Sequence, residues 1–262
     1  MGVYCFTVDD NIRFLKELTQ EDYLDIFDHP YLAMYRRLHQ KFGVKVQLNL
    51  FYEMPEFDLT QMTDRFKAQW EENADWLKLS FHSKLENVCP YEFSDYQEVC
   101  EDCSAVNREI LRFAGPASLA ETTTIHYCRA TAQSLQALKD LEVRGLLGLL
   151  GSPENPRTSY EVPMDMAEQI RAGQIIPFRD IAMGSLDMVI NDCKRENQLP
   201  ALARLLPRDQ FHLMIHEQYF YSDYVRYIPD FEEMLHDIFA YMEDNGFAPR
   251  FFEEMIPEMR RM

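Results

Sequence analysis

Segments with the two-residue period of a β-strand alternate along this chain with segments of helical period. The clearest strand patterns are residues 44–50 and 77–82, each apolar on one face and polar on the other. A helical stripe at residues 30–42 ends at Gly43, a residue that often closes helices. Because strands that alternate with helices form mostly parallel sheets, this order predicts an α/β fold.

The polar faces of the strands narrow the choice of fold. Gln47 and Asn49 share a face of one expected strand, and Ser80 and His82 share a face of the next. Strands of an open sheet covered by helices on both sides read as nearly continuous apolar runs, whereas a closed barrel can have a polar interior. We therefore expect a distorted (β/α) barrel of about seven parallel strands, formed as a single domain by residues 1–262.

The later part of the chain contains three more segments with a strand pattern and one proline-rich region without a clear pattern. Strands are expected at residues 122–127, 144–150 and 211–216, and the first of them contains His126. Prolines divide residues 151–208 into short pieces in which few elements can be recognised.

Composition excludes two classes of partner. The chain has 26 Lys plus Arg against 44 Asp plus Glu, a formal net charge of −18. Nucleic acid and anionic membranes are bound through basic charge, so we expect neither as a partner. No apolar run approaches the ~20 residues of a membrane span, the start lacks a secretory signal, and we expect the six scattered cysteines to be thiols. These features predict a cytoplasmic protein and leave its oligomeric state open.

Polar side chains able to bind metal occur where the expected strands end. Asp9 and Asp10 follow an apolar strand, and because side chains alternate along a strand, both can face one site only at its end. In a parallel barrel the active site lies at the carboxyl ends of the strands. We therefore expect one mouth to collect the polar groups at the strand ends, namely Asp9, Asp10, Asn49, His82, His126 and His216.

These segments resemble the polysaccharide deacetylases, the metal-dependent carbohydrate esterases that include chitin and peptidoglycan deacetylases. Residues 6–11, Phe-Thr-Val-Asp-Asp-Asn, are similar to the Thr-Phe-Asp-Asp-Gly motif of that family. Residues 80–86 resemble its His-Ser/Thr-x-x-His motif, and residues 213–216 its closing Leu-x-x-His motif. Residues 128–131 fall where the family has an arginine-containing motif, so the resemblance covers nearly the whole chain.

The resemblance implies a specific division of roles. Asp10 and His82 are the expected ligands of a divalent metal, with zinc as the first choice. Asp9 is the expected general base for attack of a metal-bound water, and His216 the expected general acid for the leaving amine. The implied activity is removal of an acetyl (N-acyl) group from an N-acetylated sugar or a related small amide.

The chain departs from the family at the third ligand. Glu86 stands where the family has a histidine, and His126 is a competing candidate, so either can complete the site. With Glu86, a harder ion such as manganese or magnesium is an alternative to zinc. Asn49, Arg129 and Tyr219 are the expected contacts to a carbohydrate or other small-molecule substrate.

Two other functions remain open at this point. The weakened third and fourth motifs are also what a catalytically silent barrel would show, one that binds a carbohydrate or a protein partner. A metal-independent glycoside hydrolase is the second alternative, in which Asp9 would pair with Glu86 or Glu217.

Overall fold

A six-stranded parallel sheet, the larger of the two main sheets, lies at the centre of the computed structural model, which describes residues 2–86, 90–151 and 157–257. All strand pairs in this sheet are parallel. In spatial order its strands are β10 (Met188–Val189), β11 (Gln210–His216), β1 (Gly2–Asn11), β2 (Val46–Phe51) and β5 (Leu77–Ser83), with β12 (Phe247–Pro249) also paired to β1.

The smaller sheet comes from the middle of the chain. Its neighbours are parallel except for the last pair, which is antiparallel. In spatial order its strands are β6 (Thr122–Thr123), β7 (Gly145–Gly148), β9 (Ile181–Ser185) and β8 (Ile176–Phe178).

The two sheets form the expected distorted barrel. At one junction the chain passes directly from β9 to β10, where Leu186 N–H donates to Gly148 O (2.8 Å) and Asp187 N–H to His212 O (3.0 Å). At the other junction β5 meets the chain just before β6, where Ala120 N–H donates to Leu79 O (2.8 Å). The predicted single-domain α/β fold with a parallel sheet is therefore confirmed, although the ring of strands is least regular at β5 and β6.

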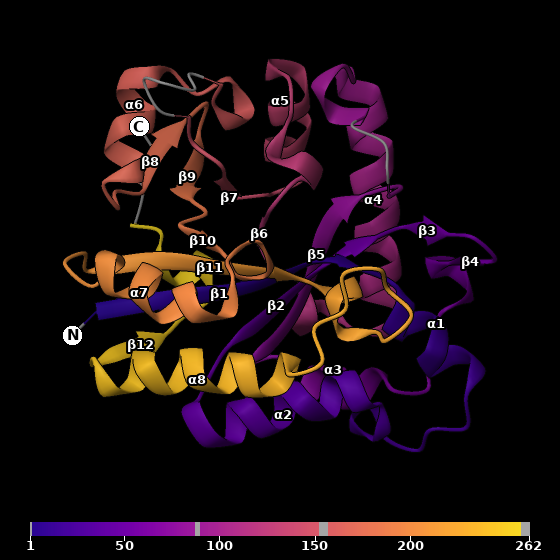
Figure 1. The fold of residues 1–262 in the computed structure, drawn as a ribbon. Helices are drawn as coiled ribbons and strands as arrows, with labels where there is room; N and C mark the ends of the chain where they lie inside the picture. Colours follow the sequence, from indigo (N-terminus) through magenta and orange to yellow (C-terminus); the bar gives the residue numbers. More distant parts are fainter. Residues whose placement is uncertain (1, 87–89, 152–156, 258–262) are drawn as a thin grey trace.

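Helices surround the strands (Figure 1). The helix predicted at residues 30–42 forms as α2 and packs against α8. α4 packs against α5 and against β5. The helices are α1 (Arg13–Gln20), α2 (Pro30–Phe42), α3 (Lys67–Glu72), α4 (Tyr96–Phe113), α5 (Ala132–Asp140), α6 (Met164–Arg171), α7 (Arg195–Leu205), α8 (Phe231–Asp244) and α9 (Phe252–Met255), and a short hairpin joins β3 (Glu53–Met54) to β4 (Phe57–Asp58).

Two expected strands are shorter than the sequence indicated. The strand predicted at 122–127 ends at Thr123, and His126 lies on a 3₁₀ turn in which Cys128 N–H donates to Ile125 O (2.6 Å). The strand predicted at 144–150 ends at Gly148. β-branched threonines favour extended backbone but do not fix where it ends.

Residues 151–208 contain more regular structure than their prolines suggested. β8, β9, α6 and α7 lie there, and Pro200 is inside α7. A proline in a helix interior removes one backbone hydrogen bond at a cost of about 3 kcal/mol. Packing of α7 against α8, with Leu202 fully buried, offsets this cost.

The interior of the barrel is polar, as the alternating strands predicted. Gln47 is buried, and its Nε2 donates to Asn49 Oδ1 (2.9 Å) and to Thr122 O (2.8 Å). Ser80 Oγ also donates to Asn49 Oδ1 (2.5 Å). Because each group has a partner, the network satisfies the rule that buried polar atoms are hydrogen-bonded, and it supports the strand ends above it.

Two findings concern the expectations from composition. No helix among the described residues is long and apolar enough to cross a membrane. Free thiols are found at all the described cysteines, and Cys89 lies outside the described residues.

Candidate metal centre

A bulge at the end of β1 turns two adjacent carboxylates toward one site. The register between β1 and β2 shifts between Val8 and Asn11, and Asp10 has a φ of 63°. Such a bulge changes the direction of a side chain that would otherwise face the opposite side of the sheet. The Asn11 amide stabilises the bulge by donating to Val8 O (2.6 Å) and to Asn49 O (3.2 Å). Asp9 and Asp10 can therefore both line the mouth of the barrel.

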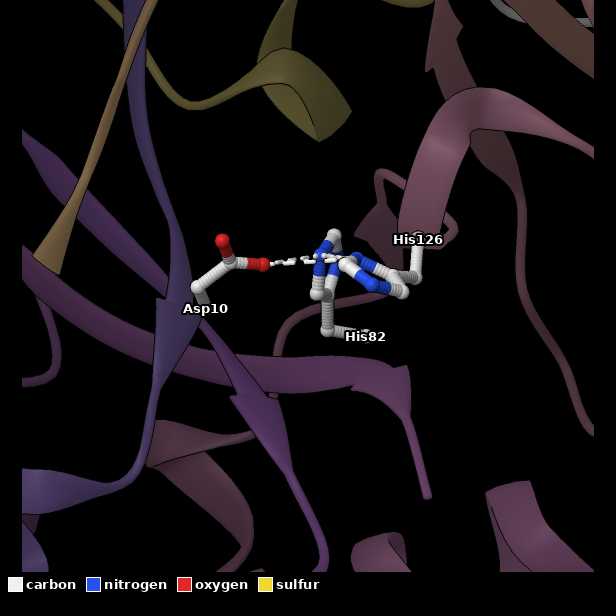
Figure 2. A group of neighbouring side chains, drawn as sticks. All are labelled: Asp10, His82 and His126. Carbon is white, nitrogen blue, oxygen red and sulfur yellow. Dashed lines mark hydrogen bonds and ion pairs between the residues drawn. The ribbon is translucent and has the colours of Figure 1, made fainter. Parts of the chain in front are cut away.

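Asp10, His82 and His126 form a compact group at this mouth, and Figure 2 shows the Asp10 carboxylate directed at both imidazoles. Asp10 Oδ1 lies 3.1 Å from His82 Nε2 and 3.3 Å from His126 Nδ1, and the two nitrogens are 3.1 Å apart. Ligand bonds of about 2.0–2.1 Å place neighbouring ligand atoms about 2.9–3.4 Å apart in octahedral or tetrahedral coordination. The three donor atoms therefore have the spacing of one face of a metal site.

The hydrogen bonds of the two histidines favour a cation between them. His82 Nδ1 donates to Thr124 O (2.5 Å), which leaves the lone pair of Nε2 directed at Asp10. A backbone partner of this kind fixes the tautomer of metal-binding histidines. The rings of His82 and His126 also contact Phe51, at centroid distances of 5.3 and 5.0 Å. One carboxylate and two imidazoles, of which His82 is orientated by its backbone hydrogen bond, fit a divalent metal ion.

The pKa shifts of the three ligands agree with a site for positive charge. Burial raises the pKa of Asp10, but its close contacts with the His126 and His82 imidazoles outweigh burial and hold this pKa well below its usual range. Burial lowers the pKa of His82, whereas the charges of Asp9 and Asp10 raise it, and the net shift is upward. The pKa of His126 is lowered, chiefly by burial. Asp10 is therefore ionised, and His126 is the more readily available as a neutral ligand.

Asp9 lies below this group and is almost completely buried. Its Oδ1 accepts a hydrogen bond from Asn49 Nδ2 at 2.6 Å. Burial raises the pKa of Asp9, and the nearby His82 and His216 only partly oppose that shift. A raised carboxyl pKa suits a general base, because proton transfer is most efficient when the pKa approaches the working pH.

His216, at the end of β11, is held by Asn191. Asn191 Oδ1 accepts both from the backbone N–H of His216 (3.2 Å) and from its Nδ1 (2.9 Å). Because this oxygen can only accept, Nδ1 carries the proton, and Nε2 is left facing Asp10 Oδ2 at 4.0 Å. His216 is therefore orientated so that Nε2 can exchange a proton with a substrate.

A cavity of about 600 Å³ connects these residues and is called the polar cavity below. Arg129 and Tyr219, two of the predicted substrate contacts, line it. Arg129 is paired with Glu92 (2.7 Å), and the Tyr219 hydroxyl accepts from Arg226 (3.1 Å). The predicted catalytic and ligand residues that line the same cavity are Asp9, Asp10, His82, Glu86, His126 and His216.

Two predicted site residues take other positions. The structure brings His126 into the ligand group and leaves out Glu86, which is only partly covered; partial burial of its carboxyl and the charge of Asp10 raise its pKa. Asn49, predicted to contact substrate, is completely buried beneath Asp9. We correct its role to positioning Asp9, since a side chain without exposed surface cannot reach a substrate.

Sequence reasoning missed two residues of the site, Asn191 and Gln218. Asn191 follows β10 in the proline-rich region where no motif was recognised. Gln218 Nε2 donates to Asp10 Oδ2 (2.7 Å), so it fixes the second oxygen of the proposed ligand. Its position two residues after His216 was the available signal, because residues just beyond a strand end face the mouth of a barrel.

Glu217 has a structural role that removes it from the glycosidase alternative. Its carboxylate accepts from the backbone N–H groups of Ile12 (2.7 Å) and Phe14 (2.8 Å) at the start of α1, and from the Tyr221 hydroxyl (3.0 Å). A carboxylate at a helix N-terminus satisfies donors that have no partner within the helix. Glu217 is therefore engaged in holding α1 against β11 and is not free to act as an acid or nucleophile.

Glu217 leads to a prediction about pH and stability. Burial raises its pKa to about 7 despite the backbone N–H groups that it accepts from. The folded chain then holds this proton more tightly than the unfolded chain, so the contribution of Glu217 to stability is largest below about pH 4.5 and is lost as pH rises to about 7. Between about pH 5 and 8 we expect wild type to lose about 2.5 kcal/mol more than Glu217→Gln.

Urea denaturation at several pH values measures this difference. The matched control is Glu233→Gln, which alters an exposed glutamate on α8 and should follow the wild-type curve. Parallel curves for wild type and Glu217→Gln would show that Glu217 titrates as it does in the unfolded chain.

The fold and the ligand group together define an α/β barrel with a candidate divalent-metal centre at the carboxyl ends of its strands. A scan against protein-family models and a search of curated proteins both find no match. Solved structures do match over almost the whole chain.

Three of these structures are similar in fold. A family 4 acetyl xylan esterase from Clostridium thermocellum in complex with a cobalt ion has 12% identity and a TM-score of 0.55, over 97% of this chain and 89% of that one. A putative polysaccharide deacetylase from Mycobacterium smegmatis has 10% identity and a TM-score of 0.56, over 97% and 88%. A mutant of a CE4 family pseudoenzyme from Bacillus anthracis has 10% identity and a TM-score of 0.54, over 98% and 68%. The chain therefore has the fold of the CE4 polysaccharide deacetylases, as the motifs predicted, in a divergent sequence.

Proposed function

We propose that this chain is a divalent-metal-dependent hydrolase that removes an acetyl or other N-acyl group from an N-acetylated sugar or a related small amide. The observation that supports this most is that the ligand group of Asp10, His82 and His126 shares one cavity with Asp9 and His216. A ligand group, a base and an acid are the three components that such hydrolysis requires.

The residues of the chain have separate roles in this reaction. When bound, a divalent cation supplies Lewis-acid polarisation of the acyl carbonyl and makes water in the cavity more acidic. Asp9 accepts the proton from the attacking water, whose oxygen bonds to the acyl carbon. As the carbon–nitrogen bond breaks, His216 acts as the imidazolium: Nδ1–H stays bonded to Asn191, and Nε2 donates its proton to the leaving nitrogen, so that a carboxylic acid and a free amine are released. Exchange with solvent then removes the proton from Asp9 and returns one to His216. Asn49 and Asn191 hold the base and the acid in place.

The donor set and the similar structures support the finer parts of the proposal. Two imidazoles and one carboxylate suit zinc better than magnesium or calcium, which prefer oxygen ligands. The structure from Clostridium thermocellum, with the same fold, is an acetyl xylan esterase in complex with a cobalt ion. We therefore propose zinc as the metal and an acetylated carbohydrate, or a small amide like it, as the substrate.

Removing and restoring the metal tests the activity. The protein is stripped with a chelator and assayed for acetate release from N-acetylglucosamine oligomers and from acetylated xylan, before and after one equivalent of Zn²⁺ or Co²⁺. We expect the chelator to lower the rate at least about 100-fold and the metal to restore it, because the carbonyl loses its Lewis acid. Acetate release that continues unchanged in the chelator would contradict the proposal and favour a metal-independent reaction.

A catalytically silent binding protein is the second candidate, favoured by the likeness to a mutant of a CE4 family pseudoenzyme. The same experiment separates the two. Uptake of one equivalent of metal without acetate release from either substrate favours the binder over an acetyl hydrolase, whereas metal-dependent turnover excludes that role.

A further inference from the structure

A second cavity, of about 640 Å³, adjoins the polar cavity at the metal ligands. It is called the apolar cavity here, because side chains of the ends of β1 and β2, the β3–β4 hairpin and the following loops give it a largely apolar lining. Its apolar lining residues are Ile12, Phe51, Met54, Pro55, Leu85 and Tyr221. Asp10, Glu86, Gln218 and Tyr224 line both cavities, so a molecule bound at Asp10 has access to each of them.

The walls of the apolar cavity are preformed. Phe51 is 1% exposed, and its ring contacts the rings of His82 and His126, so the apolar lining begins at the metal ligands themselves. The hairpin is tied to β5 and its extension by Glu53 N–H, which donates to Lys84 O (3.0 Å). A preformed cavity does not lose ordering entropy when a ligand enters, and this favours binding of a complementary group.

Charge at the apolar cavity excludes anionic ligands. Among the described residues that line it, Arg13 is the one basic side chain, and it is already paired with Asp223 (2.7 and 2.9 Å) and Glu17 (2.9 Å). Glu53 and Glu86 also line the cavity and add negative charge to its wall. A second carboxylate or a phosphate would therefore be repelled, and an uncharged apolar group is the ligand that fits.

The positions of the base and the acid decide which part of the substrate lies in each cavity. Asp9 and His216 line the polar cavity and not the apolar one. Because His216 protonates the leaving nitrogen, the amine, such as an amino sugar, occupies the polar cavity. The acyl group lies on the other side of the carbonyl carbon, toward the apolar cavity. A methyl group needs roughly the volume of one water molecule, ~30 Å³, and the cavity is far larger than acetyl requires.

We propose that the apolar cavity binds an uncharged acyl group longer than acetyl, so that the preferred substrate is an N-acylated amino sugar or a similar amine with a medium-length acyl chain. This inference rests on the proposed function, since it places the scissile amide at Asp10. It makes Met54 and Phe51 specificity-determining residues for the acyl group.

A series of N-acylglucosamines, from acetyl through butanoyl and hexanoyl to octanoyl, tests the inference with the zinc-loaded protein. We expect kcat/KM to rise up to about fourfold for each added methylene until the cavity is filled. Met54→Trp fills part of the cavity and should remove most of the preference for hexanoyl over acetyl. Leu24→Trp adds the same indole at a site that is 88% exposed and outside both cavities, and should keep the preference.

The affinities for N-hexanoylglucosamine and N-acetylglucosamine are measured in parallel by calorimetry. The binding data distinguish a failure of this inference from a failure of the proposed function. Turnover of N-acetylglucosamine with no gain for longer acyl groups would overturn the inference and leave the proposed function intact. A second outcome is no turnover of any compound, with wild type binding N-hexanoylglucosamine at least about tenfold more tightly than N-acetylglucosamine and Met54→Trp showing no such difference. This outcome would support acyl binding in the apolar cavity and overturn the proposed hydrolase activity. Equal binding of both compounds without turnover would overturn both.

Discussion

Replacing His126 with alanine is expected to lower affinity for Zn²⁺ or Co²⁺ by at least about 100-fold, whereas Glu86→Ala should leave affinity within about threefold of wild type. Substitution of residues that only support metal ligands costs about 10–100-fold, so loss of a ligand atom should cost at least as much. His126 Nδ1 lies 3.1 Å from His82 Nε2 and 3.3 Å from Asp10 Oδ1, and Glu86 is outside this group.

The visible spectrum of bound Co²⁺ provides a second measurement, because its intensity reports the number and geometry of the ligands. His126→Ala should change the spectrum, and Glu86→Ala should not. If Glu86→Ala weakens binding and His126→Ala does not, the third ligand is Glu86, and its carboxylate must move toward Asp10 when metal binds. The pair of variants thus decides between the two ligands that the sequence left open.

The ends of the strands could be predicted from sequence, because apolar and polar residues alternate along each strand and this pattern stops where the strand stops. Asp10, His82 and His216 each follow an alternating or apolar run, and the barrel brings them to one mouth. His126 was proposed from alternation as well, but it lies on a 3₁₀ turn beyond a short strand. A residue two or three positions past a strand end reaches the same mouth whether the backbone is extended or turned.

Other parts of the site depend on contacts between distant segments, which a sequence pattern does not contain. Asn49 was correctly predicted to face the barrel interior, but its depth beneath Asp9 depends on how β1, β2 and β5 are staggered. Glu217 caps a helix that begins about two hundred residues earlier in the chain. Asn191 lies after β10, a strand of two residues that is too short to have a recognisable period. Such contacts between residues far apart in the sequence can be recognised only in the folded structure.

Asp9→Asn is expected to retain metal binding and to lower kcat about 10²–10⁴-fold, the range that general-base catalysis contributes. Asp9 is not in the ligand group, and an asparagine at this position still has an oxygen that can accept from Asn49 Nδ2, so the fold should be preserved. The amide cannot take a proton from water, which removes the chemical role while leaving the shape unchanged.

Asp192→Asn is the matched control, since Asp192 is an exposed aspartate that lines the same cavity and lies outside the ligand group, and an asparagine there keeps an oxygen that can accept from Asn191 Nδ2 (3.2 Å). It should keep kcat within about threefold, because it changes the charge of the cavity without removing the base. Metal content of both variants is measured with Co²⁺, so that a loss of rate can be separated from a loss of metal. If metal-loaded Asp9→Asn keeps more than about a tenth of the wild-type rate, another group takes the proton. His216 would then be the remaining candidate, because it faces the same cavity and its Nε2 is 4.0 Å from Asp10 Oδ2.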